Sequence, residues 1–134
     1  MNYLNNKSKC NIKGANLLIS NKLFAPSVHC SYYAVFQKIK YLYIYKSEIS
    51  YEDFHEETQQ HKGSSHTYLI NKFVTMYGRM TNDKYKKRYL RNQIRELKAS
   101  RQEADYDNKE VSSEISIEVL KKSKKIISNI NKLI

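Results

Sequence analysis

The sequence predicts an all-α protein, an antiparallel up-and-down bundle of four to five helices that forms a single domain over residues 1–134. The 134 residues include only three glycines and one proline, too few turn-forming residues for a typical β-sandwich or Rossmann-type fold. Apolar residues recur at steps of three and four in several long segments, and no segment alternates convincingly as a strand would. A chain of this length is also large enough to bury a real hydrophobic core.

The first two predicted helices lie on either side of Pro26. Residues 2–22 carry apolar side chains at a helical spacing that is loose at the start and improves later. A second helix can begin at Pro26, because proline is tolerated in the first turn. Its main apolar stripe contains Val28, Tyr32, Val35, Phe36, Ile39, Leu42 and Tyr43. A further stripe of Tyr33, Tyr41 and Tyr45 predicts that this helix is covered on more than one side.

The next segment is polar and is followed by another amphipathic helix. Residues 47–63 are locally acidic, and we expect a loop with at most one short helical turn there. Gly63, Ser64 and Ser65 then offer a helix N-cap. The stripe of this helix is His66, Leu69, Ile70, Phe73, Met76, Tyr77 and Met80. Thr81-Asn82-Asp83 supplies a turn and the next cap.

The last two helices are predicted over residues 84–104 and 114–133, with a break between them at 105–113. The inner stripe of the first is Leu90, Ile94, Leu97, Arg101 and Ala104, so Arg101 falls in line with apolar residues. The stripe of the second is Ile115, Val119, Ile126, Ile130 and Leu133, with an adjoining seam of Leu120, Ile127 and Ile134. This apolar face is wider than one helix contact requires, so it predicts either a subunit interface or a broader core face.

The charge is strongly positive and unevenly distributed. The chain has 24 Lys and Arg against 13 acidic residues, a formal net charge of +11, which favours a polyanionic partner such as nucleic acid. A merely soluble basic surface is the alternative. Eight of the basic residues lie close together: Lys84, Lys86, Lys87, Arg88, Arg91, Arg95, Lys98 and Arg101. With them stand Tyr85 and Tyr89, which could stack on unpaired bases, although packing at the edge of the stripe is the simpler interpretation.

Composition also restricts the compartment and the cofactors. Cys10 and Cys30 are too few for a disulfide framework and lack the spacing of a metal site. The polar N-terminus has no apolar signal segment, and no apolar run approaches the roughly 20 residues that span a bilayer. We therefore expect a cytoplasmic, soluble protein without membrane contact, metal or cofactor.

Three motifs in order resemble those of a known family. These are S27-V-H-C-S-Y-Y-A-V-F36, K62-G-S-S-H-T-Y-L-I-N-K-F-V74 and R101-Q-E-A-D-Y-D107. Together they resemble HEPN domains, the higher eukaryotes and prokaryotes nucleotide-binding family, over roughly residues 10–133. The last motif resembles the Arg-x-x-Ala-Asp-Tyr signature of one bacterial and archaeal branch.

The resemblance implies a fold and a choice of functions. HEPN domains are up-and-down helical bundles that usually form homodimers, and many are encoded beside a minimal nucleotidyltransferase partner. Many are metal-independent ribonucleases of toxin–antitoxin, abortive-infection and CRISPR-associated systems, with an Arg followed four to six residues later by a His. Others lack that motif and are thought to bind RNA or nucleotides.

This sequence departs from the ribonuclease motif. Its four histidines all precede Arg79, the first arginine, and Tyr106 occupies the position where a His would follow Arg101. Tyrosine titrates near pH 10, so it is a poor general base at neutral pH. The departure weighs against the usual ribonuclease activity.

The candidate site residues are centred on Arg101. Its guanidinium could hold a phosphate in a bidentate grip, or it could be buried and paired with Asp105 one turn on. Asp105 and Tyr106 could orient Arg101 and contact a phosphate or base, or simply end the helix. Residues predicted to bind RNA or a nucleotide are Arg101, Asp105, Tyr106, Arg95, Arg91, Arg88 and Lys98. Candidates for acid–base catalysis are Arg101, Tyr106, His29 and His66, although a satisfied histidine is the commoner outcome.

The functional hypothesis follows from the charge, the site and the resemblance. It is a homodimeric protein that binds RNA or a nucleotide, as one component of a toxin–antitoxin or defence pair with a nucleotidyltransferase. One alternative is a metal-independent ribonuclease that uses Arg101 with Tyr106 or a nearby histidine as a substituted base. The other is a non-enzymatic interaction subunit whose positive charge meets an acidic partner.

Overall fold

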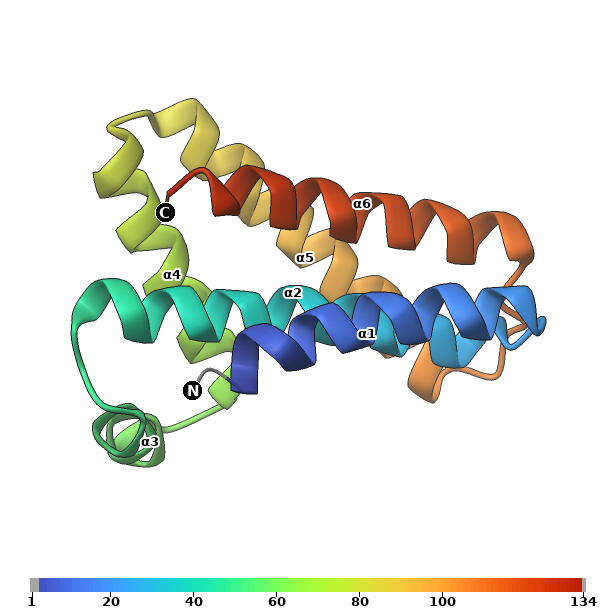
Figure 1. The fold of residues 1–134 in the computed structure, drawn as a ribbon, viewed down its shortest axis with the longest axis horizontal. Coiled ribbons are helices and arrows are strands. Elements are labelled where there is room, and N and C mark those ends of the chain that lie inside the picture. Colours follow the sequence, from blue (N-terminus) through green and yellow to red (C-terminus); the bar gives the residue numbers. More distant parts are fainter. Residues whose placement is uncertain (1–2, 134) are drawn as a thin grey trace.

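A computed structural model describes residues 3–133, which form six α-helices and no strand (Figure 1). The helices are α1 (Tyr3–Ser20), α2 (Phe24–Ser47), α3 (Tyr51–Gln60), α4 (Ser65–Thr81), α5 (Lys84–Tyr106) and α6 (Ser113–Asn131). The predicted all-α helical bundle is confirmed. The described part of the chain holds one helix more than the four to five expected.

Helix α2 is the centre of the bundle. It packs against α1, α4, α5 and α6, and Figure 1 shows α1 running antiparallel beside it along the long axis of the molecule. Helix α6 lies along this pair and also contacts α1 and α5. The small helix α3 lies apart at one end and packs only against α4 among the larger contacts. The arrangement leaves α2 covered on several sides, as its two apolar stripes predict.

Helix α3 corrects the expectation of a loop over residues 47–63. Its start is capped by Ser50, whose Oγ accepts a hydrogen bond from the backbone N–H of Asp53 at 3.0 Å. Glu52 and Asp53 lie in the first turn, where negative charge favours the helix dipole. Phe54 alone is buried, so the apolar periodicity was too sparse to predict a helix. Capping and one packed aromatic side chain are sufficient here.

Several helix boundaries differ by a few residues from those expected. Helix α2 begins at Phe24, two residues before Pro26, which still lies in the first turn. Helix α5 continues through Tyr106, so Asp105 and Tyr106 form its last turn rather than the break. Ser112 then caps α6 by accepting a hydrogen bond from the N–H of Ile115 at 3.1 Å. The extension of α5 matters because it fixes Asp105 one turn from Arg101.

The predicted apolar stripes form the hydrophobic core. Tyr32, Ile39, Leu42, Leu69, Phe73, Ile94, Leu97 and Ile130 are among its most deeply buried side chains. Met80 and Ile115, each within three residues of a helix end, are exposed instead. In the wide face of α6, Leu120 is buried and Ile127 packs partly against the core, which favours a broader core face; Ile134 lies outside the described residues.

Two sequence expectations about tyrosines have different outcomes. Tyr32 is buried in the core as expected, with 1% of its surface exposed. The expectation that Tyr85 packs against the bundle is wrong, since 82% of its surface is exposed. Tyr85 occupies the first turn of α5, where it lines the open rim of a surface cavity and little of its ring is covered. Over residues 3–133, no helix is long and apolar enough to cross a membrane.

Candidate functional site

The buried stripe of α5 ends in a charged side chain. Arg101 is only 8% exposed, and its guanidinium carbon lies 5.0 Å from the ring centre of Tyr32 and 5.9 Å from that of Tyr33. Both tyrosines come from α2, against which α5 packs. Guanidinium groups stack favourably on aromatic faces, and the attraction is stronger where water is excluded. The arginine is therefore held on an aromatic platform.

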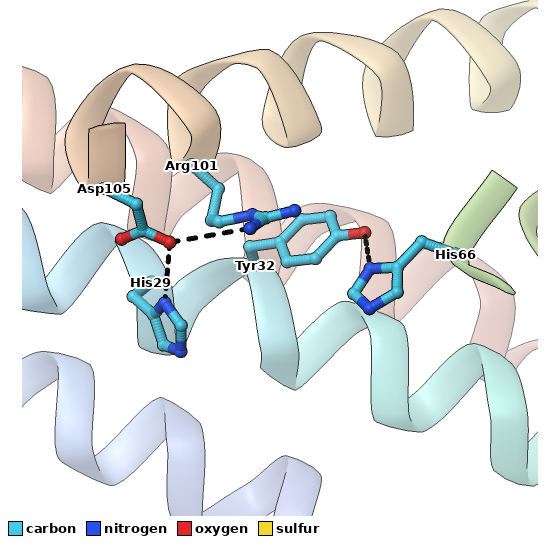
Figure 2. Close-up of polar contacts among 5 residues, drawn as sticks. All are labelled: His29, Tyr32, His66, Arg101 and Asp105. Atoms are coloured by element: carbon cyan, nitrogen blue, oxygen red, sulfur yellow. Dashed lines mark hydrogen bonds and ion pairs between the residues drawn. The ribbon is translucent and has the colours of Figure 1, made fainter. Parts of the chain in front are cut away.

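One carboxylate joins Arg101 to a histidine from another helix (Figure 2). Oδ2 of Asp105 lies 3.5 Å from Nη1 of Arg101, one helical turn away, and accepts a hydrogen bond from Nδ1 of His29 at 2.9 Å. The side chain of His29 is 48% exposed and that of Asp105 is 20% exposed. A carboxylate on Nδ1 sets the orientation and tautomer of an imidazole. The ring of His29 thus reaches solvent in a fixed orientation.

A second histidine lies on the other side of the platform. The hydroxyl of Tyr32 and Nδ1 of His66 are 2.8 Å apart, and the ring of His66 stacks on Phe36 at a centroid distance of 4.1 Å. Burial, followed by the positive charges of Arg101, Lys98 and Lys40, lowers the pKa of His66 from 6.5 to about 4. Burial also raises the pKa of Tyr32. At neutral pH the protonated phenol can donate to Nδ1 of an uncharged His66.

Positive charge at the site is incompletely neutralised. The 3.5 Å separation from Asp105 is longer than a strong charge-assisted hydrogen bond, and the buried Nε of Arg101 has no hydrogen-bond partner among the described residues. Lys98 adds a second cation, with Nζ donating to Oγ1 of Thr67 in α4 at 3.0 Å. Burial, together with the charge of Arg101, lowers the pKa of Lys98. An anion bound here would relieve this excess of positive charge.

The structure divides the predicted site residues into two groups. Arg101, Asp105, His29, Tyr32 and His66 form one contiguous group, named here the Arg101 cluster. Tyr106 borders it, with its ring centre 6.0 Å from the Arg101 guanidinium and 76% of its surface exposed. The other predicted residues form the basic stripe, which consists of Arg88, Arg91, Arg95 and Lys98. At 3.6 residues per turn these four fall within an arc of about 80° that borders Arg101.

Sequence reasoning missed part of the site. Tyr32 and Tyr33 were interpreted as core packing, which is right for Tyr32 but omits their contact with Arg101. Phe36 and Lys40 also act at the site, through the ring and the charge of His66. The spacing of His29, Tyr33 and Phe36 by three and four residues was a usable signal, because it places all three along one side of α2.

His29 and His66 were expected to have their hydrogen-bonding groups paired, and this is only partly the case. His66 has a hydrogen-bond partner and stacks between aromatic rings, as expected. His29 is paired through Nδ1, but within residues 3–133 its Nε2 makes no hydrogen bond. In the same part of the chain, no group of three or more His, Cys, Asp or Glu side chains could hold a metal ion. A cavity of about 600 Å³ lies elsewhere, between α1 and the end of α2, and touches none of the cluster.

The chain is thus an all-helical domain with a candidate site centred on a buried arginine. The family model of the HEPN domain matches residues 1–133, almost the whole chain. The protein therefore belongs to the HEPN domain family, as the three motifs predict. Because the match is to the family as a whole, the Arg-x-x-Ala-Asp-Tyr branch stays a prediction. Comparison with curated proteins gives no match.

Proposed function

We propose that the protein binds RNA or a nucleotide through the Arg101 cluster and the basic stripe. The carrying observation is the guanidinium of Arg101, which is buried against Tyr32, lies 3.5 Å from its nearest carboxylate and has an unpartnered Nε among the described residues. A phosphate supplies the two oxygens and the negative charge that such a group can still take. The exposed ring of Tyr106 next to it offers a face for a base.

The basic stripe favours a nucleic-acid strand, rather than a single phosphate, as the ligand. Arg88 and Arg95 are exposed, whereas Arg91 and Lys98 are half-buried. Successive members of the stripe lie about one helical turn apart, so they can follow the phosphates of a bound strand along α5 away from Arg101. Non-specific contacts of this kind make the affinity strongly dependent on salt.

Binding to a single-stranded RNA of about ten nucleotides, measured at several salt concentrations, tests the proposal. Affinity should fall steeply with salt, with a slope of about 0.7 per phosphate contact. Arg101→Ala should weaken binding by at least about tenfold, whereas Lys9→Ala, an exposed cation on the far helix α1, should change it little. A flat salt dependence, or equal effects of the two variants, would contradict the proposal.

A second candidate function is metal-independent RNA cleavage, and the pairing of His29 with Asp105 favours it. Tyr106 stands where the family motif has a histidine, but the structure brings His29 from α2 to the same carboxylate as Arg101. The free Nε2 of His29 could take the proton of a ribose 2′-hydroxyl. The 2′-oxygen would then attack the adjacent phosphorus, which leaves a 2′,3′-cyclic phosphate, and the departing 5′-oxygen would take a proton from solvent.

Incubation of bulk RNA with the protein in a chelator separates the two functions. A ribonuclease should cleave without metal, lose activity in both His29→Ala and Arg101→Ala, and retain it in Tyr106→Phe. His55→Ala, on the distant helix α3, is the matched control. RNA that stays intact at high protein concentration removes the enzyme and leaves the binding function.

The cellular role belongs to the same proposal. We place the protein in a toxin–antitoxin or defence pair with a nucleotidyltransferase, as a homodimer, because this is the common setting of HEPN domains that the chain resembles. Co-purification with the product of the adjacent gene tests the pair, and light scattering tests the dimer. Partner binding that persists in Arg101→Ala, together with no RNA binding, would favour the non-enzymatic interaction subunit instead.

A further inference from the structure

A second cavity, of about 320 Å³, opens between the first half of α5 and the last half of α6. We propose that it is a nucleotide-binding site, in which tyrosines stack on the base and lysines hold the phosphate. Its volume lies at the lower end of the range for small-molecule pockets, about 300–1,000 Å³. Tyr89 is 12 residues from Arg101 along α5, about 18 Å, so this site is separate from the Arg101 cluster and does not rest on the function proposed for it.

The aromatic lining has a buried floor and an exposed rim. Tyr77, Leu90 and Ile126 are buried and form the floor. Tyr85 and Tyr89 line the cavity but remain 82% and 45% exposed. The hydrophobic core is therefore complete beneath these two rings, and their exposed surface is not needed for packing. Exposed aromatic faces of this kind are stacking platforms for bases in single-strand binders.

Two side-chain amides also line the cavity. Gln93 comes from α5 and Asn129 from α6, and both are half-buried. Between Tyr3 and Leu133, neither side-chain amide has a hydrogen-bond partner. An amide carries both a donor and an acceptor, which is the combination that base edges require. Half-buried, unused amides beside aromatic faces indicate a polar planar ligand rather than an aliphatic one.

The charged groups at the cavity favour an anionic ligand. Lys86 and Lys132 line it, and Nζ of Lys125 lies 5.8 Å from the ring centre of Tyr89. No acidic residue is among the described lining residues. The neighbouring carboxylates are engaged elsewhere, since Asp83 accepts hydrogen bonds from the first turn of α5 and Glu96 pairs with Lys122 at 2.7 Å. A phosphate at the rim would meet cations only.

The shared chemistry of the ligand is one base with its phosphate, and it has two possible sources. It could be a free mononucleotide or one nucleotide of an RNA strand. Calorimetric titrations with each of the four ribonucleoside monophosphates, and separately with a ten-nucleotide single-stranded RNA, distinguish these sources. Monophosphate binding that Tyr85→Ala and Tyr89→Ala weaken indicates the free ligand, whereas RNA binding that they weaken, without monophosphate binding, indicates the strand.

Matched variants locate the binding. Tyr85→Ala and Tyr89→Ala should each lower the affinity for the ligand by about tenfold, which is the scale of one lost base stack. Tyr89→Phe should retain binding. Gln93→Ala with Asn129→Ala should reduce any preference among the four bases. Tyr45→Ala, which removes a similarly exposed tyrosine from the far end of α2, is the control. Tyr85 is so exposed that its variant tests the site even if Tyr89→Ala destabilises the fold.

Arg101→Ala separates this inference from the proposed function. Monophosphate binding that disappears in Arg101→Ala but persists in Tyr85→Ala and Tyr89→Ala would overturn the second site and leave the first. Binding of neither ligand, or binding that both tyrosine variants leave unchanged, would also overturn it. The expected result is that monophosphate binding is lost in the tyrosine variants and retained in Arg101→Ala.

Discussion

His29 and Asp105 are separated by 76 residues in the chain, yet Nδ1 of the histidine lies 2.9 Å from Oδ2 of the carboxylate. The contact links the first half of α2 to the last turn of α5. Because the same oxygen also faces Arg101 at 3.5 Å, Asp105 connects an exposed histidine to a buried arginine. This arrangement, together with His66 on its far side, has measurable consequences for stability and for RNA binding.

Asp105→Ala should destabilise the fold by about 1–3 kcal/mol, because it leaves Arg101 without a nearby carboxylate in a largely buried position. Urea unfolding at pH 7 measures the loss. When Asp105→Ala is added to Arg101→Ala, the further loss of stability should be much smaller, because the two residues share one interaction. Glu103→Ala, an exposed acid on the same turn, is the control. Fully additive losses in the double variant would show that the pair is not coupled.

Arg101→Lys should weaken RNA binding nearly as much as Arg101→Ala, although the formal charge is kept. A lysine cannot lie flat on Tyr32 or present two parallel donors to a phosphate. Arg95→Lys on the exposed stripe should bind almost normally, because a single point charge suffices there. Electrophoretic mobility shift or fluorescence anisotropy gives both affinities. If both lysine variants retain the same RNA affinity, the planar guanidinium of Arg101 is not needed for binding.

His66 should make stability fall as the pH is lowered from about 6.5 to about 4. In the unfolded chain the imidazole takes a proton near pH 6.5, whereas in the fold its pKa is about 4, because of burial and the charges of Arg101, Lys98 and Lys40. Between these values the unfolded chain binds more protons, so the free energy of unfolding decreases with falling pH. The loss is on the order of 1–2 kcal/mol after allowance for solvent screening.

Unfolding by urea at pH 7, 5.5 and 4.5 measures this dependence. His66→Gln removes the titrating group and should flatten that part of the curve, while Gln can still accept from Tyr32. His55→Gln, exposed on α3, should keep the wild-type profile. The assignment to His66 is wrong if the two variants have the same dependence on pH.

Tyr32→Phe should cost about 1–2 kcal/mol, because it removes the partner of Nδ1 of the partly buried His66. Tyr33→Phe is its matched control, since the hydroxyl of Tyr33 makes no hydrogen bond within the described residues. Thermal unfolding compares the two variants, and the Tyr33 variant should remain within about 0.5 kcal/mol of wild type. A larger loss in Tyr33→Phe would reverse the roles assigned to the neighbouring tyrosines.

Most of the bundle was predictable because its helices bury continuous apolar stripes. The stripe that runs from Leu90 through Ile94 and Leu97 is enough to place Arg101 on the inner face of α5, since all four residues repeat at helical spacing. Helix α3 was not predictable in this way, because Phe54 is its only buried side chain. The exposure of Tyr85 was missed for a related reason: periodicity places a residue on a helix face but does not say whether another helix reaches that turn.

By itself, the sequence determined the all-α class, the position of Arg101 on a buried face, and the basic stripe, because each depends on spacing within one helix. Only the tertiary structure decided that His29 would meet Asp105, that Tyr32 would support Arg101, and that His66 would be held uncharged. These contacts depend on how α2, α4 and α5 cross. Residues that lie far apart in the chain share no local period, so the packing of the helices alone brings them together.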